Sequence, residues 1–294
     1  RRRMVAEGHR ELRHDLARDL NMLGLALTSL GRCLDASAAF EHAHGMLAGL
    51  VEREGCLDLR DYLAVVGNNL AVALEDLNRK GEAVAALDGA RATLAELVGG
   101  EGRHDLRYSL AMVENNLGYE LDGLCRSEEA VGPLERARAI FMELVECDGR
   151  REYRNGLAMV DSNLGYALRH LGRLEHAVDA LERARAAYAE LVEGEGRCEL
   201  RDSLAEVDTK LGLVLVDLGR RTEAVDALER AYATRTQLFE GEGRRELLPR
   251  LCMTLDSLRV AFERFPAQAA RGLAITTRVL RLARAVGELG HAHL

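Results

Sequence analysis

The chain has 294 residues, of which 48% are hydrophobic, and its formal net charge at pH 7 is −8. Acidic residues outnumber basic residues 48 to 40, so the chain as a whole lacks the positive surface that binds a nucleic-acid backbone. Aromatic residues make up 4% of the chain and tryptophan is absent, which leaves few stacking surfaces for single-stranded nucleic acid or sugars. The composition therefore argues against both ligand classes.

The cysteine pattern and the hydropathy indicate a cytoplasmic protein. The six cysteines share no common spacing, which favours reduced thiols over a disulfide framework. No run of about 18 apolar residues occurs, so neither a secretion signal nor a membrane-spanning helix is predicted. The chain begins at Arg1 in mid-pattern without an initiator methionine. We therefore expect it to be a segment of a longer protein.

One pattern recurs along the chain with a period of 47 residues. Its markers are Gly8, Gly55, Gly102, Gly149, Gly196 and Gly243, together with Leu23, Leu70, Leu117, Leu164 and Leu211. A fixed period of this size is typical of a solenoid, in which each repeat packs mainly on its neighbours. We predict one domain over residues 3–284, with repeats at 3–49, 50–96, 97–143, 144–190, 191–237 and 238–284, followed by a C-terminal tail at 285–294.

Each repeat has the pattern of two antiparallel helices joined by a tight turn. In the third repeat, the apolar residues from Leu106 to Leu124 stand 3.6 residues apart on average, which is the period of an α-helix. The first helix is expected to end at a left-handed residue, which is Gly31, Asn78, Cys125, Gly172 or Gly219, and the sixth turn is expected near Pro266. Small residues allow the two helices to approach closely: Gly24, Ala71, Gly118, Gly165 and Gly212 on the first helix, and Ala36, Ala83, Ala130, Ala177 and Ala224 on the second.

The sixth repeat departs from this pattern. Arg259 takes the small position of its first helix, Pro266 takes the turn, and Arg271 and Arg278 take small positions of its second helix. A terminal repeat has no neighbour on one side and carries a more polar outer face. The sixth repeat is therefore predicted to be a degenerate cap.

The stretch from Asn163 to Ala184 resembles the tetratricopeptide repeat. The resemblance is carried by Leu164, Gly165, Gly172, Ala177, Leu181 and Ala184, which occur in the family's order. The unit is longer than the family's usual length of about 34 residues, as in kinesin light chain-like and bacterial signalling members, and the aromatic residue expected near Asp161 is missing. HEAT and armadillo repeats have similar lengths, but their patterns fit less well. The resemblance implies an all-α, right-handed α-solenoid of six helical hairpins, with the first helices lining a concave face that binds proteins.

The main candidate site is a row of asparagines just before the motif leucine. Asn69, Asn116 and Asn163 hold this position, and Asn68 and Asn115 adjoin two of them. In peptide-binding members of the family, a residue here hydrogen-bonds the ligand backbone, which suits an amide that both donates and accepts. The alternative is a structural hydrogen bond to a neighbouring hairpin.

Further candidates follow about one helical turn later. They are Tyr119 and Tyr166, and then Arg169 and His170. Together they could form a mixed apolar and polar groove for a peptide, because tyrosine offers a large contact area with a polar tip. The alternative is packing between repeats.

Two rows of arginines also follow the period. The first row lies near the start of the first helices and comprises Arg13, Arg60, Arg107, Arg154 and Arg201. These side chains could receive acidic ligands, but we favour a charge ladder with carboxylates of adjoining repeats. The second row follows the turn and is expected to interact with the last carbonyls of the first helix: Arg32, Arg79, Arg126, Arg173 and Arg220.

The sequence contains no paired CxxC, HExxH, P-loop or GxSxG motif. We therefore predict a noncatalytic scaffold, without cofactor or metal, that holds a peptide or a partner helix in its concave groove. The alternative is a sensor, regulatory or self-association arm of a larger bacterial signalling protein linked to an ATPase or a protease. The expected partners are proteins or peptides, with neither nucleic acid nor a membrane among them.

Overall fold

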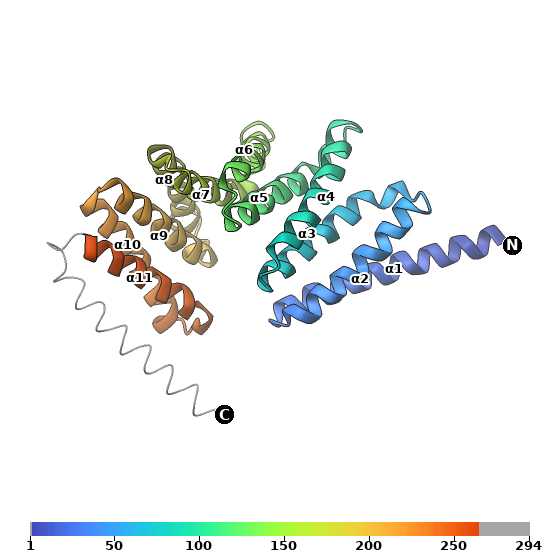
Figure 1. Cartoon of the computed structure of the whole chain (residues 1–294), viewed down its shortest axis with the longest axis horizontal. Helices are drawn as coiled ribbons and strands as arrows, with labels where there is room; N and C mark the ends of the chain where they lie inside the picture. Colours follow the sequence, from blue (N-terminus) through green and yellow to red (C-terminus); the bar gives the residue numbers. More distant parts are fainter. Residues whose placement is uncertain (1, 265–294) are drawn as a thin grey trace, which may run out of the picture. The chain divides into compact units, whose positions relative to one another are not determined.

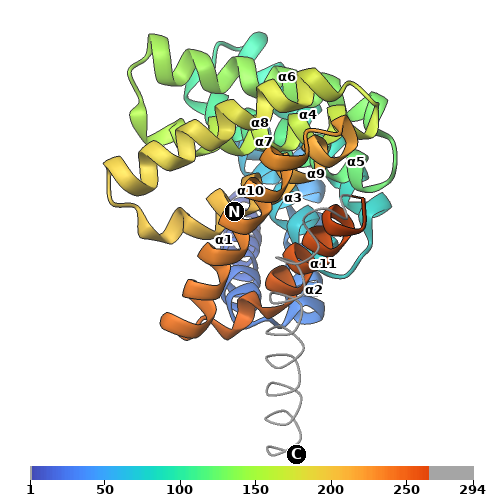
Figure 2. The ribbon, with the colours of Figure 1, turned by 90° about the vertical axis from the view of Figure 1, so that its left-hand side faces the viewer.

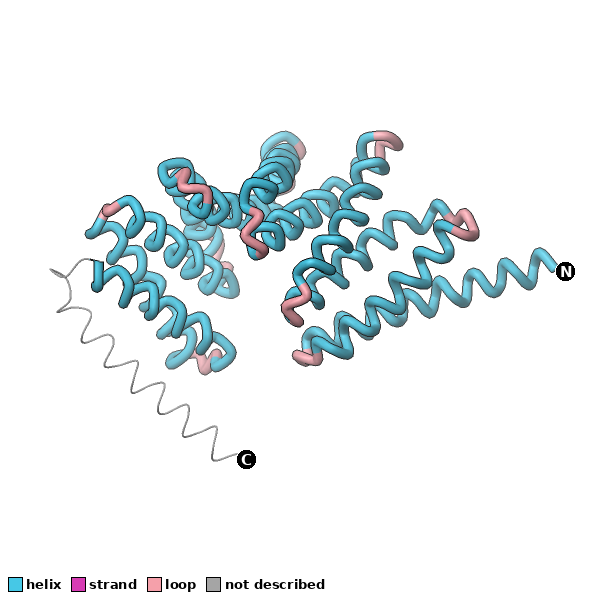
Figure 3. The backbone as a smooth tube through the Cα atoms, in the orientation of Figure 1, coloured by secondary structure: helices cyan, strands magenta, loops and turns pink. Residues whose placement is uncertain are grey.

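The computed structural model describes residues 2–264, which form helices separated by short loops (Figure 1, Figure 3). No strand occurs in this range. The α-helices are α1 (Arg2–Ser29), α2 (Cys33–Glu52), α3 (Arg60–Asp76), α4 (Lys80–Gly99), α5 (Arg107–Gly123), α6 (Ser127–Met142), α7 (Arg154–His170), α8 (Leu174–Ala189), α9 (Arg201–Leu218), α10 (Arg221–Thr236) and α11 (Leu248–Arg264). The predicted fold class, an all-α solenoid built from helical hairpins, is confirmed.

Contacts between residues divide the described part of the chain into two compact units, with the boundary between Gly156 and Leu157. The N-terminal unit contains α1 to α6, and the C-terminal unit contains most of α7 and then α8 to α11. Within a unit, each second helix packs against its hairpin partner and against the next first helix, as α2 does with α1 and α3. The helix order can also be followed in the view turned by 90° (Figure 2).

Each hairpin turn is built on one residue with a positive φ. These residues have φ between 57° and 76°, and they are Gly31, Asn78, Cys125, Gly172 and Gly219. At the first turn, the N–H of Arg32 donates to the carbonyl of Leu27 at 2.9 Å and closes the end of α1. The five predicted turn positions are confirmed. The sixth, Pro266, lies outside the described residues.

Successive hairpins are joined by a second recurring turn. A 3-10 helix precedes each first helix from α3 onward: η1 (Leu57–Leu59), η2 (His104–Leu106), η4 (Arg151–Tyr153), η6 (Cys198–Leu200) and η8 (Arg245–Leu247). Three second helices run into a short π-helical segment, namely η3 (Glu143–Cys147), η5 (Glu190–Gly194) and η7 (Gln237–Gly241). The starts of these elements recur every 47 residues, so the backbone follows the period seen in the sequence.

Glycines on the first helices set how closely a hairpin packs. A Cβ on Gly118 would lie 2.4 Å from Cγ of Leu134, and a Cβ on Gly212 would lie 2.5 Å from Cγ of Leu228. Both leucines are fully buried. The close approach of the two helices therefore depends on the missing side chain, as the sequence predicted for these small residues.

The sixth repeat is described only in its first helix, α11. Arg259 lies exposed on this helix and forms ion pairs with Asp256 and Glu263 at 2.8 and 2.6 Å. Arg271, Arg278 and the tail at 285–294 lie outside the described residues. The degenerate cap and the single domain over 3–284 therefore stay predictions.

The second arginine row contacts the last carbonyls of the first helices, as expected, but through its backbone N–H groups. The side chains of Arg32, Arg79, Arg126 and Arg220 pair with an acidic residue three positions later, at 2.5 to 2.7 Å, instead of with the carbonyls of the first helix. The backbone N–H of these arginines already satisfies the carbonyl in the turn. The guanidinium is thus left for the acid in the first turn of the second helix.

Candidate functional site

Asparagine side chains connect the first helices of the N-terminal unit. The Nδ2 of Asn69 on α3 donates to Oδ1 of Asn21 on α1 at 3.0 Å. The Nδ2 of Asn116 on α5 donates to Oδ1 of Asn68 on α3 at 2.9 Å. The row therefore forms hydrogen bonds between neighbouring hairpins, which is the structural alternative considered for these residues. We call the side of α1, α3 and α5 that carries these four asparagines the first-helix face.

These hydrogen bonds between asparagines, which we call the asparagine ladder, leave two amide atoms of α3 unused. Within residues 2–264, the Nδ2 of Asn68 and the Oδ1 of Asn69 make no hydrogen bond. Both side chains are half-buried. One donor and one acceptor thus remain on adjacent residues of α3. Asn115 differs, because it is only 2% exposed and its Nδ2 donates to Oδ1 of Asn116 at 3.1 Å.

Tyr119 is the most exposed of the candidates in the N-terminal unit. It is 41% exposed on α5, three residues after Asn116. Its hydroxyl is hydrogen-bonded to the carboxyl of Glu75 on α3. Burial raises the pKa of Glu75, and this hydrogen bond opposes the rise. The structure therefore places Tyr119 beside the asparagine ladder together with a partly buried acid.

In the C-terminal unit, the fifth repeat has a lysine where the second, third and fourth repeats have asparagine. Lys210 on α9 donates from Nζ to Oγ of Ser162 at 3.1 Å and to Oδ1 of Asn163 at 3.2 Å. Its ammonium lies 5.6 Å from the ring centroid of Tyr166. The structure thus brings two of the predicted residues of α7 together around one cation.

Arg169 and His170 adjoin the same tyrosine. The guanidinium of Arg169 lies 5.7 Å from the ring centroid of Tyr166, and the His170 ring meets that ring edge to face at 4.5 Å. Arg169 also forms an ion pair with Asp217 on α9 at 2.7 Å. Arg169 and His170 therefore both contribute to contacts within the C-terminal unit.

The first arginine row forms ion pairs at the open ends of the hairpins. Arg13 pairs with Glu54 at 2.6 Å and Arg107 pairs with Asp148 at 2.5 Å. Arg60 pairs with Glu101, and Arg201 with Glu242. In each case the acid lies 41 residues after the arginine, just beyond the second helix, in the following 47-residue segment. This arrangement agrees with the charge ladder rather than with a ligand site.

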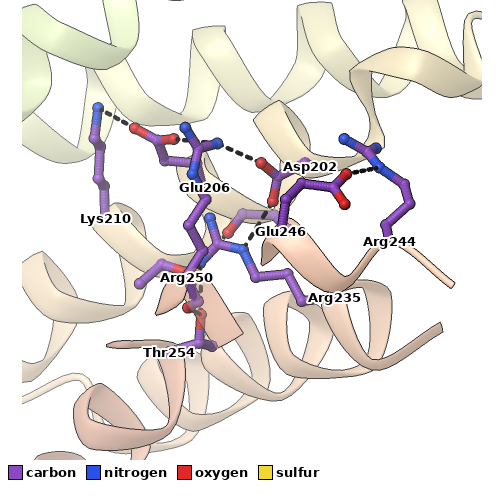
Figure 4. A network of polar contacts seen from close by, with 10 residues as sticks. Asp202, Glu206, Lys210, Arg235, Arg244, Glu246, Arg250 and Thr254 are labelled. Carbon is purple, nitrogen blue, oxygen red and sulfur yellow. Dashed lines mark hydrogen bonds and ion pairs between the residues drawn. The ribbon is translucent and has the colours of Figure 1, made fainter. Parts of the chain in front are cut away.

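Sequence reasoning missed a network of polar side chains between α9, α10 and α11 (Figure 4). Arg235 on α10 donates to Oδ1 of Asp202 at 3.0 Å and to Oγ1 of Thr254 at 2.6 Å. Asp202 is also paired with Arg250 on α11. Arg235 is 3% exposed. In the other repeats its position holds the buried residues Leu47, Leu94, Phe141 and Tyr188. That exchange of an apolar residue for arginine was the signal that could have found the network.

The network continues toward Lys210. Glu206 on α9 pairs with Lys210 at 3.1 Å and with Arg250 at 3.6 Å. Burial alone would raise the pKa of Glu206, but Lys210, Arg250 and Arg235 together hold it below its usual value. The carboxylate therefore stays ionised between its cations. It connects the residues around Tyr166 with the α10–α11 packing.

Two segments of the chain, residues 162–195 and 209–242, match the family model described as tetratricopeptide repeat. These two segments are tetratricopeptide repeats. Each matched segment begins on a first helix and ends after the following second helix. The family resemblance seen in the sequence is thus confirmed.

Solved structures with tetratricopeptide-type folds resemble the chain. BtubC (BKLC) from P. vanneervenii has a TM-score of 0.57 at 22% identity, over 80% of this chain and 86% of its own. A kinesin light chain-like protein of P. anserina with nearly identical TPR-like repeats has a TM-score of 0.55 at 21% identity, over 76% and 97%. A Rap protein complexed with Competence and Sporulation Factor has a TM-score of 0.54 at 15% identity, over 92% and 75%. No curated protein matches the sequence.

The third, fourth and fifth repeats each contain a buried acid that pairs with an arginine of the second helix. The pairs are Glu114–Arg136 at 2.8 Å, Asp161–Arg183 at 2.9 Å and Asp208–Arg230 at 2.7 Å. Acid and arginine are each spaced by 47 residues, so the pairing could have been read from the sequence. Asp161 lies near the position at which the family's pattern has an aromatic residue, and in this chain it pairs with Arg183.

A second buried acid, Glu120 on α5, lies near Glu75. Its Oε2 has no hydrogen-bond partner among the described residues. Burial and the neighbouring Glu75 raise the pKa of Glu120 to about 7, and Lys80 opposes the rise. Sequence reasoning missed this residue, although glutamate replaces the alanine found at 73 and 167.

Residues 2–264 contain neither a metal site nor a membrane-spanning helix. No group of histidine, cysteine, aspartate or glutamate among the described residues is arranged to hold a metal ion. None of the described helices combines the length and the apolar character needed to cross a membrane. All six cysteines are free thiols.

Proposed function

We propose that this chain is a noncatalytic scaffold that binds an extended segment of a partner protein along the first-helix face. The observation that carries the proposal is the pair of unused amide atoms, Nδ2 of Asn68 and Oδ1 of Asn69, within an otherwise hydrogen-bonded ladder. An extended peptide presents alternating N–H and C=O groups. One donor and one acceptor on adjacent residues can bind such a backbone without regard to its side chains.

The surroundings of these two atoms support the proposal. The hydrogen bonds to Asn21 and Asn116 hold the amides in fixed orientations, so little side-chain entropy is lost on binding. Tyr119 offers a partly exposed ring beside them. Tetratricopeptide repeats as a class form scaffolds for other proteins, and one structure with this fold was solved in complex with the Competence and Sporulation Factor. For the C-terminal unit taken by itself, Asn163, Tyr166, Arg169 and His170 are proposed as partner contacts.

Asn68→Ala and Asn69→Ala test the proposal on whatever partner the wild-type chain recovers in a pull-down. Each substitution should weaken binding of that partner by about 1 kcal/mol, which is the usual net contribution of one hydrogen bond. Asn21→Ala is the matched control, because it removes the ladder bond of Asn69 but neither of the two unused atoms. If Asn21→Ala weakens binding as much as Asn69→Ala, ladder rigidity rather than ligand contact is responsible. Unchanged affinity in both Asn68→Ala and Asn69→Ala contradicts the proposal.

A second candidate function is self-association through α1. Leu23 is 50% exposed, whereas Leu70, Leu117, Leu164 and Leu211, at the same position of later repeats, are buried. Leu12 and Leu16 are also exposed on α1. Sedimentation of the wild type and of Leu23→Glu tests this candidate, with Met253→Glu on α11 as the control for a charge at an exposed apolar residue. A monomer at all concentrations argues against it.

A further inference from the structure

One buried position of α5 departs from the residue type found in the other repeats. Glu120 is 2% exposed, and the corresponding residues Ala73, Ala167 and Val214 are equally buried but apolar. A carboxylate placed where the fold accepts alanine costs free energy unless it has a partner. Local departures of this kind are expected at functional sites. Glu120 therefore needs an explanation beyond packing.

The charges around Glu120 do not balance. The groups that face it are Glu75 on α3 and Lys80 on α4. Glu75 is influenced in turn by Tyr119, Asp76 and the same Lys80. One ammonium therefore serves two carboxyls, and Oε2 of Glu120 has no hydrogen-bond partner within residues 2–264. The cluster therefore has fewer cations than carboxyls.

Lys80 lies between this cluster and an open hollow. Its Nζ would be 2.3 Å from a Cβ on Gly123, so the lysine lies directly over the glycine backbone. Both residues line a hollow of about 590 Å³ that also includes Asn78 and Leu124. The C-terminal ends of α3 and α5, at Asp76 and Gly123, lie beside this hollow. Helix C-termini carry partial negative charge and favour cations.

We propose that Glu75 and Glu120 bind a basic side chain, arginine or lysine, of the partner segment that lies on the first-helix face, with Lys80 moving aside at the hollow. This proposal rests on the proposed function and names the chemistry of its ligand. A guanidinium or ammonium group supplies the hydrogen-bond donors that Oε2 of Glu120 lacks. The net charge of −8 likewise favours a basic partner.

Binding of this kind is coupled to proton release. Glu120 keeps its proton up to a pH of about 7, because burial and Glu75 raise its pKa. A bound cation favours the ionised form, so the proton leaves when the basic side chain enters. Affinity for a basic segment should therefore rise between pH 6 and pH 8.

The experiment compares two pools of short peptides, degenerate except for one central residue. That residue is arginine in one pool and citrulline, its neutral isostere, in the other. Retention of each pool is measured at pH 8 on immobilised wild type, Glu120→Ala and Glu75→Gln. Glu135→Gln, which neutralises an exposed acid on α6, is the control. Glu120→Ala introduces the alanine of neighbouring repeats and should fold, which circular dichroism checks.

The expected result is about tenfold stronger retention of the arginine pool by the wild type and by Glu135→Gln. This preference should be lost in Glu120→Ala and reduced in Glu75→Gln. Equal retention of both pools by the wild type overturns the basic-side-chain site but leaves peptide binding in place. Retention of neither pool overturns the site and also counts against the proposed function. An arginine preference that survives in Glu120→Ala overturns the assignment to this carboxylate.

Discussion

At the scale of single residues, the informative positions are those where the repeat is broken. Lys210 replaces asparagine, Arg235 replaces a large apolar residue, and Glu120 replaces alanine. Sequence spacing located the asparagine row, but it could not decide whether the amides bond to a ligand or to each other. That choice depends on which side chains face each other across neighbouring hairpins, as Asn116 faces Asn68. Periodicity gives the position of a residue within the repeat, but it does not identify the side chain that this residue contacts.

Glu120 makes stability depend on pH. Its pKa is about 7 in the folded chain, against 4.5 ordinarily. Between these values the unfolded chain has lost the proton that the folded chain still binds, so stability falls as pH rises, by about 3 kcal/mol in all. Glu120→Ala removes this loss. The free energy of unfolding is measured in urea for both proteins. The value for Glu120→Ala minus that for the wild type should be about 3 kcal/mol larger at pH 8 than at pH 4.5. A gain that is the same at both pH values contradicts the assignment.

The buried arginine of α10 predicts an asymmetry between two substitutions. Asp202→Ala leaves Arg235 buried without its carboxylate, and should lower the free energy of unfolding by about 3–5 kcal/mol. Arg235→Leu restores the residue of the first two repeats and should cost much less, because Asp202 keeps Arg250 as a partner. Chemical denaturation of both variants measures the difference. Equal losses would show that the network does not depend on the Asp202–Arg235 pair.

At the scale of elements, the sequence predicted turns better than side-chain partners. Four of the five hairpin turns were located because a left-handed backbone conformation strongly favours glycine or asparagine. Cys125 was found only through the period, since its residue type gives no such signal. The second arginine row contacts the predicted carbonyls through its backbone N–H, whereas the partner of its guanidinium groups was not predicted. The acid three residues later was the better signal.

Hairpin packing predicts opposite effects for two glycine substitutions in the N-terminal unit. Gly118→Ala places a Cβ 2.4 Å from the buried Leu134 and should destabilise the chain by about 1–3 kcal/mol. Gly89→Ala in α4 meets no atom within 4 Å and should stabilise it by about 0.5–1 kcal/mol. Thermal unfolding of the two variants tests this. The packing argument is wrong if both shift the midpoint in the same direction.

At the scale of the whole molecule, each hairpin contacts mainly the next one. Helix α4 packs on α3 and α5, and Leu94 is fully buried there. Leu94→Ala should cost about 2–5 kcal/mol and speed hydrogen exchange in α3, α4 and α5. Exchange in α9 to α11 of the C-terminal unit should remain as in the wild type. Faster exchange by the same factor along the entire chain would indicate a single cooperative unit instead.

The central claim is that a partner binds along the first-helix face, and hydrogen–deuterium exchange of the chain with and without its recovered partner tests it most directly. The account predicts added protection in α3 and α5, around Asn68, Asn69 and Tyr119. Exchange in α4 and α6 should change little, because these second helices do not carry the unused amide atoms. Protection confined to α4 and α6, with α3 and α5 unchanged, would contradict the account.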